Sequence, residues 1–303
     1  MNRKFNQVEQ LAARITRSSS LQTYYTIRYF ADRDLAGEAY CAYGYFRWVD
    51  DILDGTSRSQ AEKRTFLDRQ KQILAAGQPD GLALCPEEEM LLALAHNCPD
   101  RTSGLWSYLE NMMAVMAFDL ERRGRLVSQV ELTEYSRRLA TSVMDGLMYF
   151  IGHDQLIPDL PGKYDAVTAA HITHLLRDAY EDADVGYFNI SAEFLQRHGM
   201  TPHNLDSPEY RTWACQRVKL ARAYFRSGRA YIARIQHFRR RLAGLAYTAR
   251  FEWVLRAIER DRYCLRADYS QRKSLRAALA MGWSVLVSAL FPLASTAGQT
   301  TLN

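Results

Sequence analysis

Residues 47–54 read Arg-Trp-Val-Asp-Asp-Ile-Leu-Asp and close an aromatic stretch that begins at Tyr43. An α-helix turns by about 100° per residue, so Asp50 and Asp54 lie one turn apart on the same face. Like charges at this spacing repel each other by roughly 0.2–0.5 kcal/mol, and the apolar neighbours add to that cost because they indicate partial burial. The stretch predicts a helix whose acids need a cation, although taken alone it is more typical of a solvated acidic turn.

The composition favours a large globular core and suits an anionic small-molecule substrate. The chain has 303 residues, 48% of them hydrophobic, and a formal net charge of +5. Its Lys and Arg residues are interleaved with acids, so no nucleic-acid partner is expected. Five cysteines, an odd number without a CxxC motif, are typical of reduced thiols in a cytoplasmic protein. The N-terminal segment contains no apolar stretch of the kind found in secretory signals.

Hydrophobic residues recur with the 3.6-residue period of helices along nearly the whole chain, and no clear alternating strand pattern appears. The sequence therefore predicts an all-α fold in a single domain spanning residues 1–303. The expected helices cover about 5–17, 21–30, 35–54 after an Asp34 N-cap, 60–76, 86–96, 103–120, 130–151, 164–184, 192–198, 208–236, 242–261 and 270–290. The longest apolar run, about 279–294, is interrupted by polar residues and is shorter than the ~20 residues that span a bilayer. At most a peripheral membrane contact is expected.

A second acidic motif, His-Ile-Thr-His-Leu-Leu-Arg-Asp-Ala-Tyr-Glu-Asp, occupies residues 171–182. In one continuous helix, His171 lies about 20° around the axis from Asp178. His174 and Asp182 each lie about 40° from Asp178, and Arg177 is adjacent to it. The helix is therefore predicted to present two imidazoles and two carboxylates on one face.

Two aspartate pairs on separate helices, each beside an arginine, suit the binding of Mg²⁺ and a diphosphate. Carboxylates are hard oxygen ligands for Mg²⁺, and arginines neutralise the charge that remains on the phosphates. No phosphate-binding GxxxxGK[ST] loop is present. Two alternatives stay open at this point: unrelated acids on two solvated helix faces, and a transition-metal site built on His171 and His174.

These motifs resemble the squalene/phytoene synthase family, the head-to-head branch of the trans-prenyltransferases. The resemblance covers about residues 20–275, with the motifs in the same order and at appropriate spacing. The matching motifs are the tyrosine-rich opening at 23–30, the signature RxxDDxxD at 43–54, the helix DL…EL..Y that includes Asp119-Leu and Glu131-Leu-x-x-Tyr135, and the signature LRDxxED at 176–182 followed by Gly186-Tyr-Phe.

The resemblance implies an isoprenoid synthase fold, a helical bundle around a central cavity that two facing aspartate-rich helices close. The first helix would hold Mg²⁺ and the diphosphate of an allylic prenyl donor, and the second would hold further Mg²⁺. The implied metal ligands are Asp50, Asp51, Asp54, Asp178 and Asp182. The implied substrate contacts are Tyr24, Tyr43, Arg47 and Arg177, with Tyr135 facing the reacting carbons. Mg²⁺ would stabilise the departing diphosphate, and an aromatic cavity would keep water from the carbocation.

Two histidines depart from the family's pattern. His171 and His174 replace a glutamine and an asparagine, and the asparagine normally helps to hold Mg²⁺. Imidazole is a poorer Mg²⁺ ligand than an amide oxygen, so one metal position is altered. A histidine can instead accept a proton near neutral pH.

Four further departures favour a modified acceptor site. Phe251 and Asp268 replace a tyrosine and an arginine that contact diphosphate in the family. Thr141 and Met144 replace two glycines, the second of which leaves space for a prenyl chain that Met144 would fill. Ordinary sequence drift is the alternative explanation, especially at Asp268.

The sequence therefore predicts a Mg²⁺-dependent prenyltransferase that transfers an allylic cation to a hydrophobic, aromatic small-molecule acceptor. In this hypothesis His171 or His174 removes the proton from the ring. The alternative is the head-to-head condensation of two prenyl diphosphates, which is the usual reaction of the family. A non-catalytic assembly role is less favoured because all five aspartates are retained.

Overall fold

The computed structural model describes residues 2–77, 83–153, 157 and 159–269, and within them it contains helices and no strands. The helices are α1 (Asn2–Ser19), α2 (Leu21–Phe30), α3 (Ala36–Asp54), α4 (Gln60–Ala76), α5 (Pro86–Asn97), α6 (Gly104–Arg122), α7 (Gln129–Phe150), α8 (Asp165–Arg177), α9 (Ala179–Asp184), α10 (Ala192–His198), α11 (Pro208–Arg234) and α12 (Phe238–Arg260). The predicted all-α fold is confirmed. The expected helix at 270–290 and the apolar run at 279–294 lie outside the described residues.

Two of the described helices begin where a serine precedes a glutamate by three residues. Ser59 and Glu62 form a reciprocal capping box at the start of α4, and Ser128 and Glu131 form another at the start of α7. Each box satisfies backbone N–H groups that the first helical turn leaves without a partner. The expected Asp34 cap of α3 was wrong: Leu35 is the N-cap residue and makes no side-chain bond.

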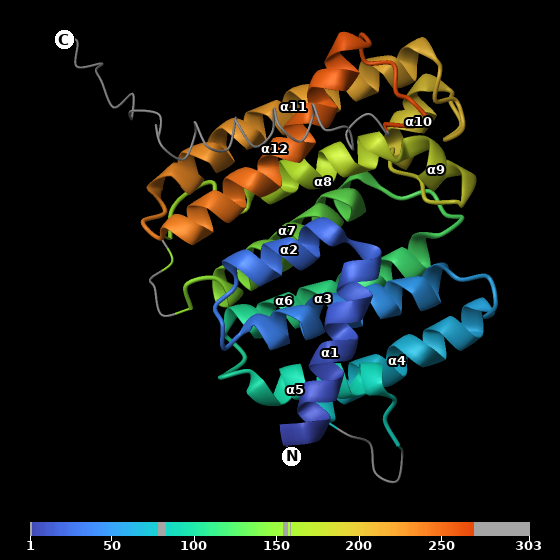
Figure 1. Ribbon diagram of the computed structural model, residues 1–303. Coiled ribbons are helices and arrows are strands. Elements are labelled where there is room, and N and C mark those ends of the chain that lie inside the picture. The colour runs from blue at the N-terminus through green and yellow to red at the C-terminus, as the bar shows by residue number, and fades with distance from the viewer. Residues whose placement is uncertain (1, 78–82, 154–156, 158, 270–303) are drawn as a thin grey trace.

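The helices form two groups, α1–α6 in the lower part of Figure 1 and α8–α12 in the upper part, with α7 packed between α6 and α8. Leu109 and Val49 belong to the core of the first group, and Phe225 belongs to that of the second. A third cluster, which includes Met144 of α7, joins α7 to α8, α11 and α12. Gly228 lets α11 approach α8 closely, because a Cβ at this position would lie 2.4 Å from the Ala166 nitrogen.

The predicted continuous helix at 164–184 is wrong, because the structure breaks it at Asp178. This residue has φ −98° and ψ 9°, lies between α8 and α9, and belongs to neither helix. Aspartate is one of the weaker helix formers. Here the Asp178 carboxylate bonds Arg177 and His174. The side chains before and after the break therefore do not share one helix face.

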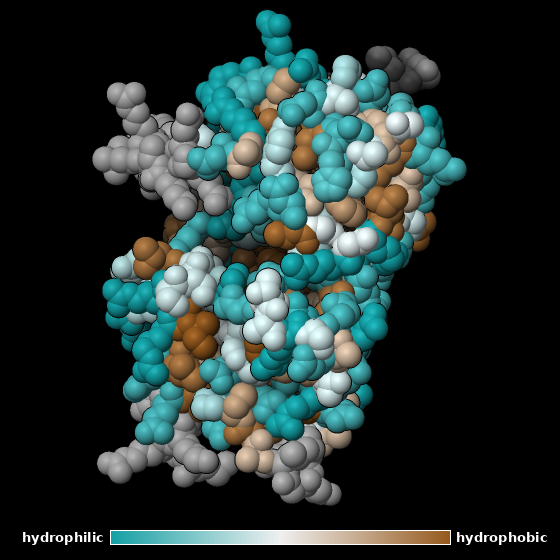
Figure 2. Space-filling model, turned by 90° about the vertical axis from the view of Figure 1, so that its right-hand side faces the viewer, coloured by the Kyte–Doolittle hydropathy of each residue, from teal (hydrophilic) through white to brown (hydrophobic). Residues whose placement is uncertain are grey.

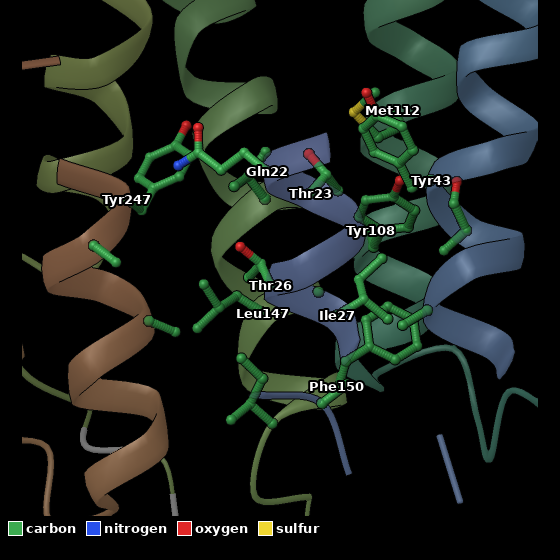
Figure 3. Close-up of a pocket in the computed structure, with 18 of the residues that line it drawn as sticks. Gln22, Thr23, Thr26, Ile27, Tyr43, Tyr108, Met112, Leu147, Phe150 and Tyr247 are labelled. Atoms are coloured by element: carbon green, nitrogen blue, oxygen red, sulfur yellow. Dashed lines mark hydrogen bonds between the residues drawn. The ribbon is translucent and has the colours of Figure 1, made fainter. Parts of the chain in front are cut away.

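A cavity of about 340 Å³ lies between α2, α3, α6, α7 and α12, within the size range of small-molecule sites (Figure 3). Aliphatic and aromatic side chains such as Ile27, Tyr108, Leu147, Phe150 and Tyr247 form most of its wall. The described residues thus contain the central cavity that the isoprenoid synthase fold implies. Among these residues, no helix is both long enough and apolar enough to cross a bilayer.

Candidate active site

The carboxylates of α3 are held by one arginine and one tyrosine. Arg47 Nη1 lies 3.1 Å from Asp50 Oδ2, and its other terminal nitrogen pairs with Asp51. Asp51 points toward solvent, with 53% of its side chain exposed. Asp54 accepts a hydrogen bond of 3.0 Å from the Tyr187 hydroxyl, which comes from the turn after α9. The end of α3 is therefore in direct contact with the segment that follows the second motif.

Asp178 and Asp182 have different partners. The Arg177 guanidinium pairs with both oxygens of Asp178, and His174 Nε2 lies 2.8 Å from Asp178 Oδ2. Burial acts to raise the pKa of Asp178, but the hydrogen bonds and charges of Arg177 and His174 outweigh it and hold that pKa well below its ordinary value. Asp182 instead accepts a hydrogen bond of 2.6 Å from Asn189 Nδ2. Asp178 is thus already neutralised, whereas Asp182 has only an amide partner.

Arg122, at the end of α6, joins the two aspartate-rich segments. Only 5% of this residue is exposed, and its Nε donates to Asp119 Oδ1 at 2.7 Å. Its Nη1 donates to Asn189 Oδ1 at 3.1 Å. The guanidinium also lies 4.9 Å from the ring centre of Tyr135 and 4.8 Å from that of Tyr187. One buried cation therefore contacts both the tyrosine that bonds the first motif and the asparagine that bonds the second.

Two glycines hold the turns around this arginine together. Gly124 and Gly186 have φ of 75° and 92°, and the Gly124 nitrogen donates to the Gly186 oxygen at 2.8 Å. A Cβ at Gly186 would lie 3.2 Å from that nitrogen, so both the backbone conformation and the contact favour glycine. Between them, Arg123 donates to the backbone oxygens of Asp54 at 3.4 Å and Val185 at 3.1 Å. The Arg123 guanidinium thus bridges the end of α3 and the end of α9.

The surroundings of Asp50 and Asp182 favour their protonated, neutral forms. Burial, reinforced by the charge of Asp54, raises the pKa of Asp50 to about 7. Burial also raises the pKa of Asp182 to about 6, against the hydrogen bond from Asn189. Such oxygens suit Mg²⁺, which binds through one or two carboxylates together with substrate phosphates. In the part of the chain that the structure describes, no three His, Cys, Asp or Glu side chains form a metal-binding group.

We expect Mg²⁺ binding to strengthen with pH in the range of these pKa values. Below about pH 7, Mg²⁺ must displace a proton from Asp50, whose pKa is about 7, and near pH 6 it must also displace one from Asp182. The apparent affinity should then rise by about tenfold per pH unit for each proton displaced, and level off above about pH 7.5. Calorimetric titration in buffers of different ionisation enthalpy measures the proton release. An affinity that is constant between about pH 5.5 and 8 would contradict this assignment.

The apolar cavity leads toward these carboxylates. Tyr43 of α3 lines the cavity and Asp50 follows seven residues later, which is ~10 Å along a helix. Met112 of α6 lines it as well and has the same spacing to Asp119. Figure 2 shows the face on the α9 side of the molecule, which is hollowed between the two helix groups and has hydrophobic residues inside the hollow. A substrate with an anionic head and an apolar tail fits this arrangement.

The two histidines of the second motif do not point into the cavity. His171 is 4% exposed, its Nδ1 lies 3.1 Å from Ser136 Oγ, and its ring meets that of Tyr135 edge to face at 4.8 Å. Burial lowers the pKa of His171 well below its ordinary value. The Tyr135 hydroxyl donates to Asp119 at 3.1 Å, so this tyrosine belongs to the Arg122 network. His174 is half exposed and bonds Asp178.

Three other residues with a predicted substrate contact lie outside the wall of the large cavity. Met144 is 4% exposed and packs in the third cluster, whose nearest pocket has a volume of only about 20 Å³. Phe251 is 3% exposed, with the Arg250 guanidinium 4.4 Å from its ring centre. Tyr24 stacks on Tyr40 at 5.4 Å where α2 meets α3. Of the predicted substrate contacts, only Tyr43 lines the cavity, and Arg47 and Arg177 lie at its acidic end.

Four residues of the site were missed by the sequence analysis. Asp119 and Tyr187 lie inside motifs that match the family, but nothing in their spacing distinguishes them from ordinary helix and turn residues. Arg122 belongs to a run of charges, Glu-Arg-Arg-Gly-Arg, that is typical of a solvated turn. Asn189 carries no signal in a single sequence. The contacts of Arg122 with Asn189 and of Tyr187 with Asp54 join residues that are more than 60 positions apart.

Comparison with known proteins points to the same family that the sequence motifs resemble. The family model described as squalene/phytoene synthase matches residues 16–278. A presqualene diphosphate synthase of Zymomonas mobilis is 29% identical over 167 residues, and this match covers 53% of each chain, so the chain spans about half the length of this curated relative.

Solved structures share the fold. The squalene synthase HpnC of Alicyclobacillus acidocaldarius has a TM-score of 0.63 and 18% identity, with 86% of this chain and 97% of that chain covered. The chain TcSQS, solved with the ligand BPH1237, has a TM-score of 0.65 and 13% identity, with 94% of this chain and 89% of that one covered. On the match of the family model over most of its length, the chain belongs to the squalene/phytoene synthase family, a family of prenyltransferases.

Proposed function

We propose that the protein is a Mg²⁺-dependent prenyltransferase that joins two prenyl diphosphates head to head. The observation that carries this proposal is the convergence of both aspartate motifs on the Arg122 network at the end of an apolar cavity. The name of the Zymomonas relative, a presqualene diphosphate synthase, supports the same chemistry. Head-to-head condensation, the alternative function given in the sequence analysis, thus has better support than prenyl transfer to an aromatic acceptor.

Mg²⁺ fits the donor set at this junction. Asp50 and Asp54 on one side and Asp182 on the other offer hard oxygen ligands, and a bound cation would favour the ionised forms of Asp50 and Asp182, whose pKa values are raised by burial. Bound there, Mg²⁺ would neutralise the charge that develops on a departing diphosphate. Asp178 would bind the metal if it gave up its contact with Arg177 or with His174.

The side chains of the protein have two tasks in this reaction. Arg47 and Arg177, which now pair with aspartates, are placed to contact a diphosphate when the metal takes over those aspartates. The cavity wall keeps water from the allylic cation that forms when the C1–O bond breaks. The double bond of the second prenyl chain attacks this cation, and the new carbon–carbon bond is followed by loss of a proton.

The departing diphosphate is the basic group available to take that proton. The described residues that line the cavity include tyrosines, threonines, Gln22 and Arg250, but no carboxylate and no histidine. The sequence proposed His171 or His174 as the base. His171 is buried and bonds Ser136, and His174 bonds Asp178, so neither lines this wall. These contacts weaken the case for a histidine base, and prenyl transfer to an aromatic acceptor is the second candidate.

Incubation with a single prenyl diphosphate separates the two candidates. Purified protein with Mg²⁺ and farnesyl diphosphate alone should give a product that contains two prenyl chains, detected by mass spectrometry. Geranyl and geranylgeranyl diphosphate, tested in parallel, identify the chain length that is accepted. Consumption of the donor only when an aromatic acceptor is added would reject head-to-head condensation and establish the second candidate.

We expect a bulkier side chain in the cavity to shorten the preferred prenyl chain. Ala243 of α12 lines the cavity, so the ring of an Ala243→Phe variant would occupy space that a long chain needs. The ratio of kcat/KM for geranylgeranyl diphosphate to that for geranyl diphosphate should fall by about tenfold. The ratio cancels any loss of folded protein, and Ala75→Phe on the exposed face of α4 is the matched control. An unchanged ratio in Ala243→Phe would mean that the prenyl chain binds elsewhere.

A further inference from the structure

Helix α2 separates the cavity from solvent. Gln22, Thr23, Thr26 and Ile27 line the cavity from its inner side, as Figure 3 shows, yet none of its ten residues is buried. Its ends are anchored, since Ser20 caps the first turn and Arg239 donates to the backbone oxygen of Phe30 at 3.0 Å. The outer side of this helix therefore lies one helix away from the cavity.

This outer side carries a stripe of large apolar side chains. Leu21, Tyr25 and Tyr29 follow one another at intervals of four residues, which places them along one face of the helix. They are 58%, 44% and 68% exposed, and the rings of Tyr25 and Tyr29 stack at 5.9 Å. Contiguous exposed apolar residues of this kind mark interaction surfaces, and tyrosine is enriched at the boundary between water and lipid. We refer to these three residues as the α2 stripe.

A basic pocket adjoins the stripe. It has a volume of about 340 Å³ and is lined by Arg28, Tyr29, Ala31, Arg33, Ala36 and Tyr40. Arg28 and Arg33 are exposed and form no ion pair with any residue in the described ranges. The pocket also borders the first turn of α3, whose N–H groups receive no side-chain cap. Two guanidinium groups beside free N–H groups are suited to a phosphate group.

The charge around the stripe is positive over a wider area. Residues 10–31 include Arg14, Arg17 and Arg28 and no acidic residue. Of the acids that follow, Asp32 pairs with Arg239 and Glu38 accepts a hydrogen bond from Asn97, which leaves Asp34 as the exposed acid beside Arg33. Exposed apolar side chains, tyrosines and arginines on one face are the combination by which peripheral proteins bind anionic lipid surfaces.

We propose that the α2 stripe and the basic pocket dock the protein on an anionic phospholipid bilayer. The stripe inserts among the headgroups, and the pocket receives the phosphate of one lipid. This orientation turns the cavity, behind α2, toward the membrane. The docking itself is independent of the reaction, whereas its use for delivering an apolar product to the bilayer rests on the proposed function.

Vesicle sedimentation with the full chain, without substrate, tests the docking. Wild-type protein should bind vesicles of phosphatidylcholine with about 30% phosphatidylserine at least tenfold more tightly than vesicles of phosphatidylcholine alone. The Arg28→Glu/Arg33→Glu variant should lose that difference, and Tyr25→Ser/Tyr29→Ser should weaken binding to both vesicles. The matched controls, Arg64→Glu/Arg226→Glu and Val130→Ser, change exposed residues on other helices and should bind as wild type does.

Other occupants of this face give different results. Equal binding by the wild type and the Arg28→Glu/Arg33→Glu variant would overturn the proposal. Binding of inorganic phosphate in the basic pocket, without binding of the protein to vesicles, would also overturn it. The pocket would then be a site for a free anion. An oligomer that dissociates in Tyr25→Ser/Tyr29→Ser, without vesicle binding by the wild type, would show that a second copy covers the stripe. Because no substrate is present, none of these results bears on the proposed reaction.

Discussion

The variants Asp50→Asn and Asp182→Asn should each lower Mg²⁺-dependent diphosphate release by roughly 10³-fold. Each removes a hard oxygen ligand from one side of the junction while keeping the shape of the side chain. The loss is large because the stabilisation of the departing diphosphate supplies several kcal/mol of the barrier reduction. Steady-state release of pyrophosphate from a prenyl diphosphate measures it. Activity within about tenfold of wild type in either variant would remove that aspartate from the metal site.

A stability measurement shows whether Asp50→Asn acts on the site or on the fold. Burial raises the pKa of Asp50 to about 7, so the group contributes stability that is present below its unfolded pKa and is lost as the pH rises through about 7. At about pH 8 and without Mg²⁺, Asp50→Asn should therefore melt roughly 2 °C above the wild type, whereas near pH 4 the two should be alike. Asp68→Asn, at a side chain that is 67% exposed, is the control. A lower melting temperature for Asp50→Asn at pH 8 would mean that the fold is damaged.

Arg122→Met should have the largest effect on stability. It leaves Asp119 buried without its ion pair at 2.7 Å and Asn189 without a donor. The removal of one partner of a buried ion pair costs about 3–5 kcal/mol. The free energy of unfolding, measured with urea, should fall by that amount.

Arg125→Met is the matched control for this variant. The Arg125 side chain is 44% exposed and pairs with Glu131, so its loss should change stability by about 0.5 kcal/mol or less. If Arg122→Met also stayed within about 1 kcal/mol of wild type, Arg122 would not be the cation that joins the two motifs.

The helices and the acidic pairs could be predicted because their signals are local. Capping boxes such as Ser59–Glu62 and the 3.6-residue period each lie within one helix. The spacing of Asp50 and Asp54 likewise needs only the geometry of one helical turn. The prediction failed at Asp178 because the angles around one continuous helix do not apply where the backbone breaks the helix.

The contacts across the site could not be predicted in this way. Arg122 reads as one charge in a basic turn, and its burial arises only when α7 and the segment after α9 pack over it. Met144 and His171 were assigned to the acceptor site by their position in a motif, but their side chains face the packed interior. A single sequence predicts which residues form a helix, but not which other helix packs against each of its faces.

A double-mutant cycle on pyrophosphate binding tests most directly whether both aspartate motifs hold one anion. The affinity of inorganic pyrophosphate in the presence of Mg²⁺ is measured by calorimetry for the wild type, Asp50→Asn, Asp182→Asn and the double variant. If the two motifs share one site, the losses will be non-additive by at least about 1 kcal/mol, and the double variant will bind little worse than the weaker single variant. Additive losses, or unchanged binding in either single variant, would contradict a shared diphosphate site.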